Sequence, residues 1–403
     1  MIFCNRPLAR LGAAALLASG VFAGLGAPAY AEAVETDLSL DVVGTKVAAD
    51  AQGKVAFARI TNRGEHAPSK VTVTIDVSKV DFDEVAVLPI EEDCDLEGEL
   101  KPTRWTCVLP PEALPGPGVT VDVPVVLFKA PDLEGRYAAP VTLTIVAPED
   151  VNTNNDSRAA TVEFSEEHGP DLVTQADDVT RGFKVTEDEA IPLEDLRAGD
   201  QAELHYLVAN QGDQIALGLK STIKLPEGVT FGAKYEHCDY DAAMRSVSCV
   251  WEDVLLYAVQ DDRDDRDDRY SVIDVHFPIK VGKDVKPGTL TGGVVTTAAI
   301  ATEHTTPYTA KAGLPSFIKG LPANATDVDA SDNTDPYAVI VAEGNRGGSG
   351  GGGGGGGLPV TGPQAGLVGG VGAAVLAAGG AMFVLARRRR VVLVTPGDEK
   401  PTA

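Results

Sequence analysis

Short stretches in which apolar and polar residues alternate recur along the chain between residues 36 and 342. The clearest are 71–77, 119–123 and 141–145, where every second residue is Val, Ile or Leu and the residues between them are mostly Thr or Asp. Alternation with a period of two buries one face of a strand and leaves the other in water. Gly, Pro and Asn separate these stretches, as they do in turns. The pattern therefore predicts an all-β fold of short antiparallel strands.

Three sequence markers occur twice in the same order, which predicts that one β unit is duplicated. Each copy has an Asn-x-Gly turn after an early strand, then a pair of cysteines, then a turn rich in Asp and Asn before the last strand. The markers are Asn62-x-Gly64, Cys94 with Cys107, and 150–155 in the first copy, and Asn210-x-Gly212, Cys238 with Cys249, and 327–333 in the second. We expect one copy at 36–165 and the other at 170–342, with 166–170 as a short hinge.

At these markers the chain resembles bacterial immunoglobulin-like repeats of the cell-adhesion-related (CARDB-like) kind. The resemblance implies two tandem antiparallel β-sandwiches. The second copy carries two inserts. The run of three Asp-Asp-Arg repeats at 261–269 is too polar to bury, so we interpret it as a solvated loop, with a cation or partner patch as the alternative. The segment 303–325, with three prolines, is also expected to loop out.

The chain has five cysteines, of which Cys4 lies near the N-terminus. The spacing of the other four favours disulfides between Cys94 and Cys107 and between Cys238 and Cys249, because each pair is close in sequence and the pairs are far apart. Free thiols or a four-cysteine metal site are the alternatives, although zinc sites usually show CxxC-like spacing. Trp105 and Trp251 should each lie on the face of the neighbouring cysteine, either in the core or exposed to a ligand.

The N-terminus has the three parts of a secretory signal peptide. Arg6 and Arg10 precede an apolar run at 11–25, and Ala29-Tyr30-Ala31 follows it. We expect residues 1–31 to be removed after Ala31. The alternative is an uncleaved anchor helix, but the apolar run is shorter than the roughly 20 residues that span a bilayer.

The C-terminus carries four elements in a fixed order. A Gly-rich linker at 343–357 precedes Leu358-Pro359-Val360-Thr361-Gly362. The charge-free segment 365–386 would form a helix of about 33 Å, enough for a hydrocarbon core of about 30 Å. The basic tail 387–403 begins with four arginines, which favour a cytoplasmic location and stop translocation: Arg387, Arg388, Arg389 and Arg390.

At this C-terminus the chain resembles the LPXTG family of Gram-positive cell-wall surface proteins. The resemblance implies a sortase as partner, with Leu358, Pro359 and Thr361 as the recognised side chains. It also implies cleavage between Thr361 and Gly362 and a covalent bond from Thr361 to peptidoglycan. The expected location is the outer face of the cell wall.

The net charge of −25 argues against a nucleic-acid partner, because it repels phosphates. The six histidines are scattered, and neither an HExxH pair nor a glycine loop for phosphates occurs. Asp327, Asp329 and Asp332 suggest calcium, but they do not follow the EF-hand pattern, so a plain turn is favoured. We therefore expect no catalytic residue, no metal and no cofactor.

The sequence thus favours a non-catalytic surface display protein that acts as an adhesive or structural stalk and binds an unidentified protein or carbohydrate. A wall-bound carbohydrate-active hydrolase and a ligand-free spacer are the alternatives.

Overall fold

The computed structural model describes residues 35–90, 94–98, 101–130, 133, 135–185, 190–259, 270–300 and 326–344. The expected signal peptide with Ala29 and Ala31, the sorting motif 358–362, the span 365–386 and the arginines 387–390 all lie outside these residues, as do both inserts. Within the described ranges, no helix is both long and apolar enough to cross a membrane.

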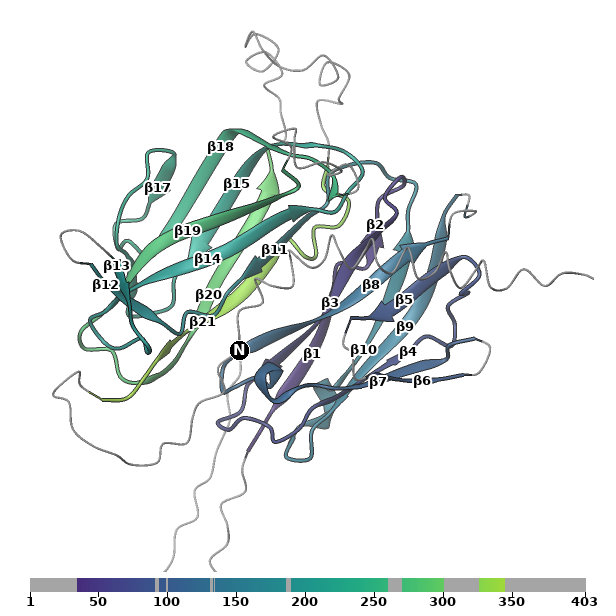
Figure 1. Ribbon diagram of the computed structural model, residues 1–403, viewed down its shortest axis with the longest axis horizontal. Helices are drawn as coiled ribbons and strands as arrows, with labels where there is room; N and C mark the ends of the chain where they lie inside the picture. Colours follow the sequence, from purple (N-terminus) through teal and green to yellow (C-terminus); the bar gives the residue numbers. More distant parts are fainter. Residues whose placement is uncertain are drawn as a thin grey trace, which may run out of the picture. The chain divides into compact units, whose positions relative to one another are not determined.

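The first ten strands form two sheets, which we call the first sheet pair (Figure 1). One sheet has the order β1-β3-β8-β5 and the other β2-β10-β9-β4-β7-β6. Neighbouring strands are antiparallel, apart from the parallel pairing of β10 with β2. The strands are β1 (Leu38–Val43), β2 (Lys46–Val47), β3 (Gly53–Asn62), β4 (Thr72–Asp76), β5 (Val85–Pro89), β6 (Cys94–Glu97), β7 (Arg104–Val108), β8 (Thr120–Lys129), β9 (Tyr137–Val146) and β10 (Ser157–Phe164).

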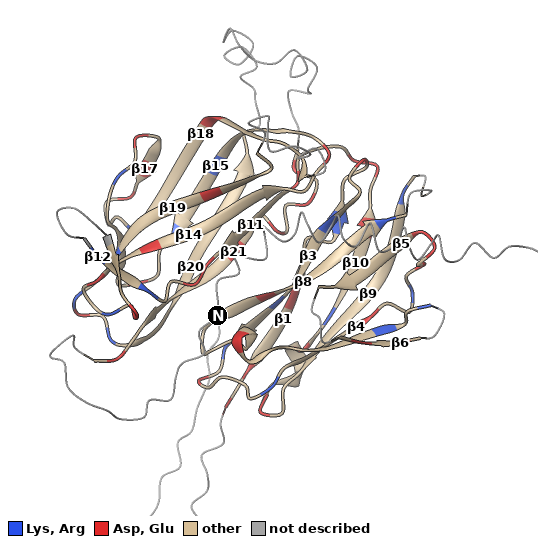
Figure 2. Cartoon of the chain, viewed as in Figure 1, with Lys and Arg blue, Asp and Glu red and all other residues tan. Residues whose placement is uncertain are grey.

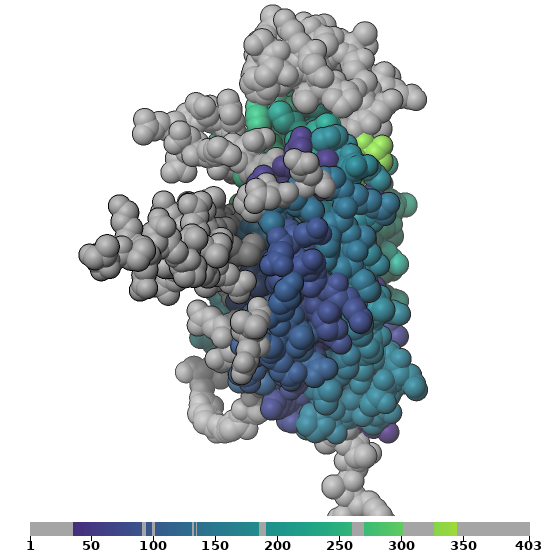
Figure 3. All heavy atoms as spheres, turned by 90° about the vertical axis from the view of Figure 1, so that its right-hand side faces the viewer, coloured from purple at the N-terminus to yellow at the C-terminus, as the bar shows by residue number. Residues whose placement is uncertain are grey.

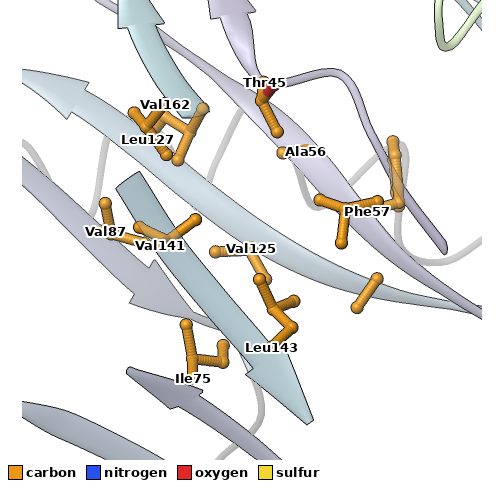
Figure 4. Close-up of a pocket in the computed structure, with 12 residues that line it drawn as sticks. Thr45, Ala56, Phe57, Ile75, Val87, Val125, Leu127, Val141, Leu143 and Val162 are labelled. Atoms are coloured by element: carbon orange, nitrogen blue, oxygen red, sulfur yellow. The ribbon is translucent and has the colours of Figure 1, made fainter. Parts of the chain in front are cut away.

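An apolar core lies between the two sheets of the first pair. The alternation expected at 71–77 and 141–145 holds, because Ile75 on β4 and Leu143 on β9 are buried while Thr74 and Thr144 are not. Ile75, Val125 and Leu143 are among the side chains that line a small gap between the sheets (Figure 4). The gap holds about 10 Å³ and its lining is almost entirely apolar, so it is a packing defect at the lower limit for one water molecule rather than a ligand site.

The remaining strands form the second sheet pair, with sheet orders β13-β12-β14-β19-β16 and β17-β18-β15-β20-β21, and β11 paired with β14. Tyr206 on β14, Ile223 on β15 and Phe277 on β19 belong to its buried apolar core. The strands are β11 (Leu172–Ala176), β12 (Gly182–Val185), β13 (Ala190–Pro192), β14 (Gln201–Asn210), β15 (Ala216–Lys224), β16 (Val229–Phe231), β17 (Cys238–Tyr240), β18 (Ser246–Leu256), β19 (Val272–Val281), β20 (Gly288–Ala299) and β21 (Thr334–Val341). The all-β class expected from the sequence is confirmed.

A disulfide closes the same hairpin in each sheet pair. Cys94 on β6 bonds Cys107 on β7, and Cys238 on β17 bonds Cys249 on β18. Each pair occupies directly opposed positions of the two antiparallel strands. These are the pairings that the spacing favours. Trp105 and Trp251 both pack against the cores, as expected for residues on the cysteine's face.

Candidate functional site: the junction of the two sheet pairs

The Asn-x-Gly turns fold in the same way in both sheet pairs. The side-chain oxygen of Asn62 accepts a hydrogen bond from the Gly64 amide at 2.9 Å, and that of Asn210 accepts one from the Gly212 amide at 3.1 Å. A side chain on either glycine would collide with the segment that leads into the first strand of its pair. Because the glycines have no side chain, that segment can pass close by. In the second pair, the segment places Asp171 beside the first residues of β3.

In the first sheet pair, the turn before the last strand supplies amide donors to the Asp37 carboxylate. Asp150 accepts a hydrogen bond from the Leu38 amide at 2.9 Å. Asn155 donates from its side-chain amide to Asp37 at 3.1 Å. Asn152 donates to the same carboxylate oxygen at 3.4 Å. Two amide donors therefore satisfy the Asp37 carboxylate.

The matching turn of the second pair has the same backbone contacts but different side chains. Asp327 accepts from the Leu172 amide at 3.1 Å, as Asp150 does from Leu38. However, Asp329 and Asp332 stand where the first copy has Asn152 and Asn155, and Asp171 stands where it has Asp37. Amide donors are thereby replaced with carboxylates, which leaves several negative charges close together and needing a cation.

Lys54 of β3, in the first sheet pair, supplies that cation. Its Nζ lies 2.6 Å from Asp171, 3.0 Å from Asp332 and 3.7 Å from Asp329. The side chains of Lys54 and Asp171 are 0% exposed and that of Asp332 is 1% exposed. The turn also contacts the first pair through its backbone, since Ser331 Oγ accepts from the Gly44 amide at 2.9 Å. Carboxylates of one sheet pair thus surround a buried lysine of the other.

Burial and charge shift the protonation of this cluster in opposite directions. Burial disfavours the charged amine, but the surrounding carboxylates outweigh it and raise the pKa of Lys54. Burial raises the pKa of Asp171 to about 7 and that of Asp332 well above its usual value. Burial also acts on Asp329, but Lys54 and Ser331 outweigh it and lower its pKa. Burial therefore favours the neutral forms of Asp171 and Asp332, whereas Lys54 and Ser331 favour the charged form of Asp329.

Arg59, also on β3, makes a second charged link. Its guanidinium binds both carboxylate oxygens of Asp122 on the neighbouring β8 at 2.9 Å. It also reaches β21 of the second pair, where it contacts Asp335 at 2.7 Å and the carbonyl of Thr334 at 2.9 Å. Bidentate pairs of this kind fix geometry as well as contribute energy.

Neutral contacts complete the junction. The side-chain amide of Gln211 mimics a strand neighbour, because it accepts from the Val55 amide at 2.7 Å and donates to the Val55 carbonyl at 3.2 Å. Val55 and Phe57 form a buried apolar cluster with residues of the second pair that include Val173 and Ala209. The two sheet pairs therefore share an interface with both apolar packing and buried ion pairs.

The segment 166–170 is held by hydrogen bonds from both sides. The carbonyl of Glu167 accepts from the Ala49 amide at 2.9 Å, and the carbonyl of Gly169 accepts from the Asp213 amide at 3.1 Å. Our interpretation of this segment as a hinge missed these contacts, because each partner comes from a distant part of the sequence.

Sequence reasoning also missed Lys54 and Arg59. The turn at 327–333 is a turn, as expected, but its carboxylates are buried around an amine. One signal was available, namely the replacement of Asn152 and Asn155 in the first copy by Asp329 and Asp332 in the second. The partner of those acids could not be found from the local sequence.

Charged residues occur in both sheet pairs of the described chain. Acidic positions occur in turns and at strand ends of both sheet pairs (Figure 2). The face that Figure 3 presents has no deep hollow among its coloured residues.

No protein-family model matches the chain, and no curated protein matches its sequence. Among solved structures, Escherichia coli alpha-2-macroglobulin activated by porcine elastase aligns at 12% identity and a TM-score of 0.23, over 78% of this chain and 22% of that one. The collagen adhesin from S. aureus aligns at 8% identity and a TM-score of 0.21, over 77% of this chain and 94% of the adhesin. Red sea bream transglutaminase aligns at 8% identity and a TM-score of 0.22, over 77% of this chain and 32% of the enzyme.

This chain therefore spans about a fifth of the macroglobulin and a third of the transglutaminase. TM-scores this low carry no argument about the function of the chain.

Proposed function

We propose that the chain is a surface protein that a sortase anchors to Gram-positive peptidoglycan through Thr361. In this proposal residues 32–342 lie outside the membrane and act as a rigid, non-catalytic stalk that presents its surface to a protein or a carbohydrate. In the same proposal, the two sheet pairs are the immunoglobulin-like sandwiches expected at 36–165 and 170–342.

The observation that supports the stalk role is the buried cluster of Lys54 with Asp171, Asp329 and Asp332. A buried amine shared among carboxylates of the other sheet pair is costly to separate, because each charge would lose its partners before it regained water. The junction therefore resists bending, which suits a module that must hold a surface away from the wall. Limited proteolysis of the purified full-length chain with proteinase K tests this role at 166–170, a segment without Lys or Arg. Slow cleavage there supports it, and rapid cleavage at His168-flanking bonds by a broad-specificity protease would contradict it.

Anchoring rests on the order of sorting motif, apolar segment and arginines in the sequence. Thr361→Ala removes the residue whose carbonyl would be joined to peptidoglycan, so the protein should move from the wall fraction to the membrane and the medium. Val360→Ala is the matched control, because the variable position of the motif lies beside Thr361 and should leave attachment unchanged. Equal wall attachment of both variants would refute the sortase proposal.

The adhesive and spacer roles differ in whether a ligand is bound. Immobilised full-length chain, tested against matrix proteins, defined glycans and bacterial surfaces, distinguishes them. Saturable binding of one ligand establishes adhesion, and its absence across these classes assigns the chain to a passive stalk. A hydrolase would require accessible facing carboxylates. Those gathered at Lys54 are buried, so a polysaccharide cannot reach them.

A further inference from the structure

A second polar group at the junction joins three segments of the chain. Asp50 follows β2 in the first sheet pair, His168 lies in the connecting segment, and Asp213 lies in the turn after β14. His168 Nδ1 is 2.7 Å from an oxygen of Asp213 and 3.6 Å from an oxygen of Asp50. One nitrogen and two carboxylate oxygens therefore converge within 4.8 Å of one another.

The backbone around the group holds it in place. Asp213 accepts hydrogen bonds from the Gly169 amide at 2.8 Å and from the Asp50 amide at 2.9 Å. Its side chain is 1% exposed, whereas those of His168 and Asp50 are 48% and 78% exposed. Asp213 is therefore held in place and buried, whereas solvent and solutes can reach the side chains of His168 and Asp50.

The charge of the group is unbalanced. In the described ranges of the chain, Asp50 and Asp213 form no ion pair with a lysine or an arginine, and His168 is the partner that they share. Two carboxylates therefore lie together beside one imidazole in a protein whose net charge is −25. The negative electrostatic field of such a protein concentrates cations at its surface.

We infer that Asp50, His168 and Asp213 form a binding site for a divalent transition-metal ion, for which zinc is the best match. Zinc takes both imidazole nitrogens and carboxylate oxygens as ligands, and water can complete the tetrahedron. Calcium is a poorer match, because it takes six to eight oxygen ligands. The bound ion would tie the first sheet pair, the connecting segment and the second sheet pair together. This inference stands independently of wall anchoring and of the stalk role.

The test uses the metal-stripped full-length chain. Calorimetric titration with ZnCl₂ should show one tight site per chain, and Co²⁺ at the same site should give visible d–d absorption. His168→Ala should weaken this site at least tenfold and abolish the cobalt bands. His276→Ala is the matched control, because His276 is also half-exposed and paired with a carboxylate, Glu203 at 2.8 Å, but lies outside the group. Its titration should equal that of the parent chain.

Asp50→Asn provides a second variant whose fold is safe, since this side chain is mostly exposed. It should also weaken zinc binding at least tenfold while the circular dichroism spectrum stays unchanged. Zinc binding that is equal in the parent chain, His168→Ala and Asp50→Asn would overturn the inference. So would the absence of a tight site, or displacement of zinc by an equal concentration of calcium.

Discussion

Lys54 carries its charge in a place that water does not reach. Without neighbouring charges, the protonated amine would be destabilised there, because burial disfavours its charged form. It is stable because Asp171, Asp329 and Asp332 surround it. The first copy forms the corresponding turn with Asn side chains and without a lysine. Substitutions can therefore test the roles of the lysine and of the aspartates separately.

Lys54→Met should destabilise the chain by about 3–5 kcal/mol, because it leaves buried carboxylates without a cation. Adding Asp329→Asn and Asp332→Asn to that variant rebuilds the amide arrangement of the first copy and should recover most of the loss. Urea unfolding followed by circular dichroism measures both effects.

Lys46→Met is the control for this series. Lys46 pairs with Glu167 at 2.8 Å, but the glutamate is 66% exposed, so its loss should cost less than about 1 kcal/mol. A triple variant no more stable than Lys54→Met alone would contradict the assigned role of the two aspartates.

The same cluster predicts how stability depends on pH. The folded-state pKa of Asp171 is raised to about 7 and that of Asp332 is raised well above its usual value, whereas an unfolded carboxyl group has a pKa near ~4. The folded chain then holds protons that the unfolded chain has released. This stabilisation is fully present below pH ~4 and is lost as the pH rises through 7, so the melting temperature should fall between pH 5 and pH 8.

Asp332→Asn should make that fall shallower, because each proton linked to folding changes the free energy of unfolding by up to about 1.4 kcal/mol per pH unit. Its amide could also donate to the Asp171 oxygen that has no donor, as Asn155 does to Asp37. Melting curves that have the same pH slope in both chains would show that Asp332 does not titrate with folding.

At the scale of elements, alternation and turn residues were sufficient to predict the all-β class and strands such as those at 71–77 and 141–145. The stretch at 141–145 lies inside β9, and its buried residues are the apolar ones at every second position. Cysteine spacing gave the hairpin disulfides, because residues that pair across a short hairpin are also close in sequence. The junction was not predictable in this way. Lys54 and Asp171 are 117 residues apart, and β3 gives no local reason to bury a lysine.

The two disulfides should contribute similarly, since each closes a loop of comparable length on an edge hairpin. Replacing both Cys94 and Cys107 with Ala should cost about 3 kcal/mol in the chain-entropy account. Replacing Cys238 and Cys249 should cost about the same. Urea midpoints of the two double variants test this, with the parent chain that has both disulfides formed as reference. No loss in either variant would mean that the closure does not constrain the unfolded chain.

At the scale of the whole molecule, the shared apolar cluster and the buried ion pairs couple the two sheet pairs. Scanning calorimetry of the parent chain should therefore show one unfolding transition for residues 36–342. Lys54→Met should separate it into two, because each sheet pair keeps its own core. Two transitions in the parent chain would mean that the junction does not couple them.

The display role depends on the covalent link to the wall, which the C-terminus of the mature protein reveals directly. Protein released from purified walls by a peptidoglycan hydrolase can be digested and its last peptide identified by mass spectrometry. The account predicts a peptide that ends at Thr361 and carries a peptidoglycan fragment in amide linkage. Recovery of the chain with 362–403 intact, extracted from cells by detergent alone, would contradict it.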